Sequence, residues 1–226
     1  MKLLAALATG LFVSQVVLAH QPTISNGTAN GPDSAIAFED IQLSRVVYHE
    51  ITSTASSLWI KFEIDQPQSL WISLGLPLID RLKGFRPAFV VLGPGLPNVD
   101  LPLETPEGLG GVLFETIEVT EPEVFYEPFS RTSSWILREE DVELPEAGTY
   151  YIVAFVPTGE TGKLWLAPGR REEFSPADIA GLGAVLDDVR RFHETSAAGS
   201  PCFLFPLAAV LVLFHTLRLI RNNSGK

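Results

Sequence analysis

Two histidines carry the most specific chemical hypothesis in this sequence of 226 residues. His20 directly follows Val17-Leu18-Ala19, which fits a signal-peptide cleavage site, so cleavage there would make His20 the first residue, with a free α-amine. That amine, the His20 ring and a second imidazole from His49 would supply nitrogen ligands of the kind that suit copper. A copper site formed by His20 and His49, known as a histidine brace, is therefore one hypothesis.

The competing interpretation is that His49 is an ordinary strand residue and that His20 is a chance neighbour of the cleavage site. The sequence contains no further ligand motif that would complete a metal site around the two histidines. We therefore expect no bound cofactor and keep copper as the alternative.

A short stretch, residues 127–135, mixes aromatic rings with hydrogen-bonding groups, as sugar-binding loops do. Its candidate ligand-binding residues are Phe129, Arg131 and Trp135. The alternative is that Phe129 and Trp135 belong to the core, where large aromatic side chains are more often found. The stretch is a candidate site for a glycan or a protein ligand.

Acidic residues crowd residues 138–143, with the sequence REEDVE. Carboxylate oxygens bind calcium, but the stretch has neither the glycine nor the alternating aspartates that set the geometry of a calcium loop. We therefore expect a solvated loop there.

Charge and motifs exclude several functions. Residues 20–200 hold all 27 acids but only 12 of the 16 Lys and Arg residues, and such a surface repels phosphate backbones, so nucleic acid is not an expected partner. The sequence contains no Gly-x-Ser-x-Gly, His-Glu-x-x-His, phosphate-loop or dinucleotide-binding motif. Catalysis is not indicated, although sequence alone gives no distances between carboxylates.

Both ends of the chain are apolar, which predicts an exported protein with a single membrane span. Residues 1–19 combine Lys2 with an apolar run and are expected to be a signal peptide. Residues 202–220 are expected to span a membrane as a short helix, and the basic tail 221–226 should lie in the cytoplasm. The small residues 196–200 also fit a glycolipid-anchor signal, but such signals have a polar spacer and an apolar end. The localisation we expect is a single-pass membrane protein with its main domain on the extracellular or lumenal side.

Two residues are candidates for covalent modification. Asn26-Gly27-Thr28 is a glycosylation sequon, which would be used in a eukaryotic secretory pathway. Cys202 is the only cysteine, so residues 20–201 can form no disulfide. Cys202 could carry a lipid or an intermolecular bridge, and the alternative is a small apolar residue of the anchor.

Between the two ends, short runs of β-branched and aromatic residues predict a mainly β domain over residues 36–168, preceded by a flexible leader over 20–35. Hairpins are expected across Gln66-Pro67-Gln68 and across residues 157–162, and we predict an antiparallel two-sheet sandwich of jelly-roll type. An amphipathic helix is predicted over 175–194, with Ser175 as its N-cap, and a linker over 195–201. The expected strands are 41–51, 58–64, 69–74, 88–92, 112–119, 124–126, 134–137, 149–156 and 163–167.

Three resemblances add to this interpretation. Residues 144–169, LPEAGTYYIVAFVPTGETGKLWLAPG, resemble the final hairpin of pre-peptidase C-terminal-type and related jelly-roll domains, which implies an appended binding or folding module without catalytic residues. The order of signal peptide, sandwich, helix, span and short tail is similar to that of the p24 cargo receptors, but their paired cysteines and tail signals are missing. A chain that begins at His20 resembles the lytic polysaccharide monooxygenases, which use such a histidine to bind copper.

The sequence thus predicts a membrane-anchored β-sandwich that acts as a binding or interaction module for a glycan or a protein. The alternatives are a copper-binding protein with a redox or metal-handling role and a cargo-type receptor of the secretory pathway.

Overall fold

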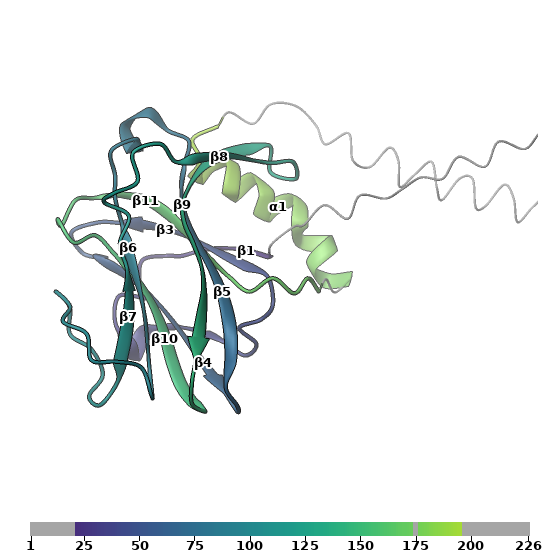
Figure 1. Cartoon of the computed structure of the whole chain (residues 1–226). Coiled ribbons are helices and arrows are strands. Elements are labelled where there is room, and N and C mark those ends of the chain that lie inside the picture. The colour runs from purple at the N-terminus through teal and green to yellow at the C-terminus, as the bar shows by residue number, and fades with distance from the viewer. Residues whose placement is uncertain (1–20, 174–175, 196–226) are drawn as a thin grey trace, which may run out of the picture. The chain divides into compact units, whose positions relative to one another are not determined.

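The computed structural model describes residues 21–173 and 176–195, which form two β-sheets packed face to face with one α-helix beside them (Figure 1). The six-stranded sheet has the order β1-β3-β11-β5-β9-β8, and the five-stranded sheet has the order β2-β4-β10-β6-β7. The strands are β1 (Gln21–Ile24), β2 (Ile36–Phe38), β3 (Arg45–Ile51), β4 (Ser57–Ile64), β5 (Gln68–Pro77), β6 (Ala88–Gly93), β7 (Gly110–Phe114), β8 (Glu123–Glu127), β9 (Thr132–Leu144), β10 (Gly148–Phe155) and β11 (Gly162–Pro168). The helix is α1 (Pro176–Phe192), and two short 3-10 helices are η1 (Pro32–Ser34) and η2 (Asp80–Leu82).

The core between the sheets is built from alternating side chains. On β4, every second residue from Leu58 to Ile64 is buried in the central cluster, whereas Lys61 and Glu63 are not. Full burial of one such apolar side chain stabilises the fold by about 1.5–3 kcal/mol. The predicted sandwich with one helix is confirmed at this level.

The sheets are mixed, so the prediction of a purely antiparallel sandwich is wrong. β1 runs parallel to β3, with Gln21 opposite Arg45, and β2 runs parallel to β4, with Ile36 opposite Ile60. Alternation could not reveal this, because side chains point to alternate faces in parallel and antiparallel strands alike. The flexible leader predicted for residues 20–35 is also corrected, since residues 21–24 form β1.

Both predicted hairpins are wrong, because the strands that they join lie in different sheets. The turn through Pro67 connects β4 of the five-stranded sheet with β5 of the six-stranded sheet, and the turn through Thr158 connects β10 with β11 in the same way. A short turn can reverse the chain within one sheet or carry it across the core to the facing sheet, and polar turn residues serve both purposes.

The acidic residues 138–143 lie in strand β9, where we expected a solvated loop. Val142 is buried in the core, while Glu139, Asp141 and Glu143 are exposed. Arg138 forms ion pairs with Glu118 at 3.0 Å and with Glu140 at 2.5 Å. The prediction of a loop was wrong because the solvent-exposed side of a half-buried strand can carry as many charged residues as a loop does.

Each outer face of the sandwich is covered in part. Apolar residues of the loop between β6 and β7, including Val99 and Leu101, pack on the outer face of the five-stranded sheet. Helix α1 packs on the outer face of the six-stranded sheet through Val189 and Phe192, which agrees with the helix predicted over 175–194 (Figure 1).

The predictions for both chain ends lie outside the described residues. These are the signal peptide 1–19, His20, Ser175, Cys202, the membrane span 202–220 and the tail 221–226. Within residues 21–173 and 176–195, no helix is both long and apolar enough to cross a membrane.

Candidate functional site

A cleft lies on the outer face of the six-stranded sheet, next to α1. It has a deep part of about 60 Å³ and a wider part of about 430 Å³, and Phe125 and Trp165 line both parts. The deep part is also lined by Pro22, Val46, Tyr48, Glu127, Phe129, Ser130, Thr132, Ser134, Ala167, Leu186 and Val189. The wider part is also lined by Ser44, Trp71, Ser73, Ile136, Glu139 and Arg170.

Trp165 separates the two parts of the cleft. Its neighbours Leu164 and Leu166 are buried between the sheets, so alternation along β11 places the indole on the outer face. Gly75 lies opposite Trp165 on β5, at a register shift that follows Leu74. A Cβ atom at Gly75 would lie 2.2 Å from Cζ2 of Trp165, so only glycine leaves room for the ring at this place.

The wider part is an aromatic surface with polar groups around it. Trp71 is half-buried, and the guanidinium carbon of Arg170 lies 4.7 Å from the centroid of its ring. The hydroxyl residues Ser44 and Ser73 are buried, whereas Glu139 is exposed. Apolar lining with a few polar groups is the usual construction of a small-ligand site.

Glu127 brings a carboxyl group to the deep part. Its Oε1 accepts a hydrogen bond from the backbone N–H of Phe129 at 3.0 Å. Burial raises the pKa of Glu127, and the negative charge of Glu172 raises it further. Burial also raises the pKa of Tyr48, and the charge of Glu127 adds to that effect. An acid therefore lies among the aromatic residues Tyr48, Phe125, Phe129 and Trp165.

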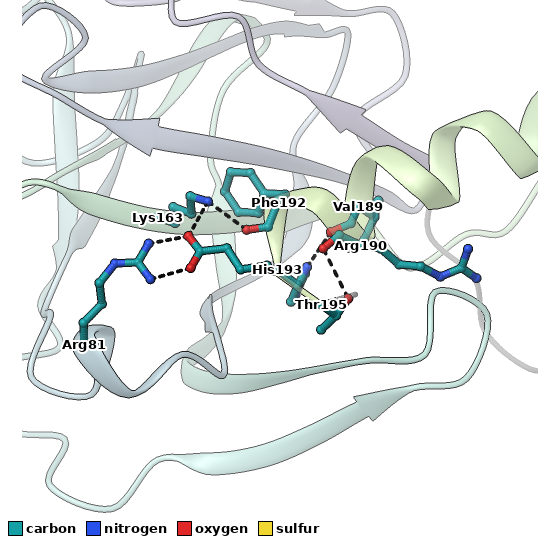
Figure 2. A network of polar contacts seen from close by, with 8 residues as sticks. Arg81, Lys163, Val189, Arg190, Phe192, His193 and Thr195 are labelled. Atoms are coloured by element: carbon teal, nitrogen blue, oxygen red, sulfur yellow. Dashed lines mark hydrogen bonds and ion pairs between the residues drawn. The ribbon is translucent and has the colours of Figure 1, made fainter. Parts of the chain in front are cut away.

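Polar contacts fasten the end of α1 to the sandwich (Figure 2). The carboxylate of Glu194 accepts hydrogen bonds from Arg81, at 2.7 Å for Oε2, and from Nζ of Lys163 at 2.8 Å. These two contacts lower the pKa of Glu194 to about 2. Lys163 also donates to the carbonyl oxygen of Phe192 at 3.0 Å. The last turn of the helix is thereby fixed beside the cleft.

The buried ring of His193 connects the same end of the helix to strand β9. Its Nδ1 lies 2.9 Å from the carbonyl oxygen of Val189, and its Nε2 lies 3.1 Å from Oγ of Ser134. A carbonyl oxygen only accepts, so Nδ1 carries the proton and Nε2 accepts from the serine hydroxyl. Burial lowers the pKa of His193 to about 4, which keeps the ring neutral.

The structure separates the three predicted ligand residues. Phe129 lines the deep part of the cleft. Arg131 is exposed in a turn with a φ of 57°, and neither it nor Trp135 lines the cleft. Trp135 packs partly buried against the core between the sheets, as the alternative interpretation stated.

Sequence reasoning missed Trp71, Phe125 and Trp165. Trp71 and Trp165 each occupy the outward position of an alternating strand, and that position was the available signal. They come from β5 and β11, which are far apart in sequence, so only the pairing of these two strands brings them to one cleft.

His49 is fully buried, and its Nδ1 lies 3.0 Å from Oγ of Ser25. Burial lowers its pKa. Gln21 begins β1 four residues before Ser25, a distance of about 13 Å along an extended strand. Gln21 therefore lies far from His49, which does not favour a brace that includes His49. His20 itself lies outside the described residues. Within residues 21–173 and 176–195, no group of three or more His, Cys, Asp or Glu side chains could hold a metal ion. Copper stays a prediction.

The sequon asparagine is exposed. Its Oδ1 accepts hydrogen bonds from the backbone N–H of Thr28 at 3.1 Å and from the Thr28 hydroxyl at 2.7 Å. Asn26 is therefore accessible to modification, and its glycosylation stays a prediction.

Comparisons with known proteins find solved structures of low similarity. No family model and no curated protein matches the chain. A similar solved structure is the pre-peptidase C-terminal domain of a collagenase from Bacillus anthracis, with 12% identity and a TM-score of 0.35 over 62% of this chain and 98% of that one. Another is CorA, a surface-associated copper-binding protein of Methylomicrobium album BG8, with 11% identity and a TM-score of 0.30 over 66% and 100%. The pre-peptidase C-terminal domain is the type of domain that residues 144–169 resemble in sequence. Similarities with such low identities and TM-scores carry no argument about function.

Proposed function

We propose that this protein is a membrane-anchored module that binds a glycan in the cleft on the six-stranded sheet. The observation that carries the proposal is the aromatic surface formed by Trp71, Phe125 and Trp165. Sugar rings have apolar faces and hydroxyl edges, so they suit a site that combines aromatic rings with nearby polar groups.

The polar groups around this surface suit hydroxyl ligands. Ser44, Ser73, Glu139 and Arg170 supply both donors and acceptors of hydrogen bonds. The wider part, at about 430 Å³, falls within the range of about 300–1,000 Å³ that is typical of small-ligand sites.

The location of the domain is part of the proposal. The apolar segments at residues 1–19 and 202–220 and the basic tail support a single span with the sandwich outside the cytoplasm. An exported domain would meet glycans of the cell surface or of secreted glycoproteins there. A cargo-type receptor would share this location but would bind a protein instead.

Titration of the full-length protein with cellotetraose and with N-acetylated chitotetraose, followed by tryptophan fluorescence, tests the proposal. We expect saturable binding of at least one of the two, which Trp71→Ala and Phe125→Ala each weaken about two- to tenfold, because one aromatic contact contributes about 0.5–1.5 kcal/mol. Tyr126→Ala is the matched control, since Tyr126 is exposed beside Phe125 on β8 but does not line the cleft. Equal losses in Phe125→Ala and Tyr126→Ala, or no binding by either sugar, would contradict a glycan site in the cleft.

A further inference from the structure

The carboxyl group of Glu127 has no positively charged partner within the described part of the chain. None of the ion pairs formed by residues 21–173 and 176–195 includes Glu127. The hydrogen bond that its carboxyl group accepts comes from a neutral donor, the backbone N–H of Phe129. A half-buried carboxylate without a counter-ion is costly, because burial disfavours the charged form.

A second carboxyl group increases the negative potential at this place. Glu172 is close enough for its charge to raise the pKa of Glu127, and its Oε1 is buried without a hydrogen-bond partner. Arg190 lies nearby, where its Nε donates to the carbonyl oxygen of Ser130 at 2.8 Å, but its ion pair is with Asp187 and not with Glu127. Two acids near one another favour the arrival of a cation, since a cation would reduce the repulsion and pair with Glu127.

The rings around Glu127 also suit a cation. Tyr48, Phe125, Phe129 and Trp165 line the deep part together with Glu127. The face of an aromatic ring attracts an ammonium group, by about 0.5–1 kcal/mol at exposed sites and by about 2 kcal/mol or more where water is excluded. The carboxylate and the aromatic rings therefore both favour a ligand with a positively charged ammonium group.

The size of the deep part limits that group. One water needs about 10–15 Å³ of such space, so the 60 Å³ of the deep part accepts a few small atoms and excludes a whole sugar ring. The wider part has room for a ring and adjoins the deep part at Phe125 and Trp165.

We propose that the deep part binds the protonated amine of an amino sugar, while the sugar ring lies in the wider part against Trp71 and Trp165. Glu127 pairs with the ammonium group, and the surrounding rings contribute through their faces. This inference rests on the proposed glycan function and specifies its substrate class: glycans that carry free, unacetylated amino groups.

The test compares N-acetylated chitotetraose with its fully deacetylated form on the full-length protein at pH 7, because the two differ only in their amines. We expect the deacetylated tetramer to bind at least tenfold more tightly to the wild-type protein. Glu127→Gln should weaken binding of the deacetylated tetramer at least tenfold and so abolish this preference. Glu123→Gln is the control, since Glu123 lies at the exposed other end of β8 and lines neither part of the cleft.

The outcomes separate the two proposals. If both tetramers bind equally to the wild-type protein and to Glu127→Gln, the amine site is wrong and the glycan function stands. If neither tetramer binds, the glycan function fails. Choline chloride is included as a third probe, and choline binding that is tighter than that of the deacetylated tetramer and is lost in Glu127→Gln would overturn the amino sugar in favour of a lipid headgroup.

Discussion

Trp165 connects the candidate site with helix α1. It lines both parts of the cleft, and with Val46 and Tyr48 it packs against Val189 and Phe192 of α1. Its position depends on Gly75, which leaves the space that the ring fills. Stability and cleft shape are therefore linked at one glycine.

Gly75→Ala tests this link. The new Cβ would lie 2.2 Å from Trp165 and 2.5 Å from the carbonyl oxygen of Trp135, so the ring and the bulge must both shift. We expect the free energy of unfolding in urea to fall by about 1–3 kcal/mol, as is typical of overpacking, and Trp165 fluorescence to change. Gly84→Ala is the control, because no atom lies within 4 Å of its Cβ position, and it should change stability by less than about 0.5 kcal/mol. Similar losses in both variants would show that the space at Gly75 is unimportant.

At the scale of elements, the sequence predicts strands and the helix well but not their partners. β4 keeps the residues expected of it, with one added at the start, because alternation marks a strand wherever its partner lies. Pairing depends on contacts between distant residues, such as Tyr151 with Lys61 across β10 and β4, which no local pattern records. The cleft could not be predicted for the same reason, since Trp71 and Trp165 meet only through strand pairing.

The end of α1 should loosen as the pH falls. His193 has a pKa of about 4 in the folded protein and about 6.5 when unfolded, so between these values the unfolded chain binds more protons. The free energy of unfolding should therefore decrease as the pH drops from about 6.5 to 4, by on the order of 3 kcal/mol from His193. Below about 4.5 the protonation of Glu194 adds to the loss, because its folded pKa of about 2 is depressed by Arg81 and Lys163.

Urea unfolding at pH 7 and pH 4.5 checks this sign. His193→Gln removes the titrating ring, so the difference in stability between the two pH values should shrink, whatever the variant does to stability at pH 7. Subtraction of the two curves cancels the contribution of His49, whose pKa is also lowered. Equal pH dependence in the wild-type protein and His193→Gln would mean that the ring is not buried as described.

At the scale of the whole molecule, the sandwich needs no covalent cross-link within the described residues. The only cysteine is Cys202, and each outer sheet face is covered in part, one by a loop and the other by α1. A domain without a disulfide depends on its core for stability.

The topology that we propose has a direct test. In intact cells or right-side-out plasma-membrane vesicles that carry the full-length protein with a C-terminal tag, added protease should remove the sandwich and spare the tag, because the basic tail is expected in the cytoplasm. Detergent should then expose the tag to cleavage. Loss of the tag from intact cells or right-side-out vesicles while the sandwich stays intact would reverse the orientation.

The crossing of the chain from sheet to sheet has a consequence for the order of events during synthesis. Ile60 of β4 pairs with Ile152 of β10, and Val47 of β3 pairs with Leu166 of β11. At about 5–20 residues per second, a ribosome needs roughly 5–25 s to make the chain between such partners. During that interval β3 and β4 lack their antiparallel neighbours, and their apolar faces remain without the core that later covers them. We therefore expect the nascent chain to bind chaperones until β11 has been made, and the rate of translation limits when the sandwich can close.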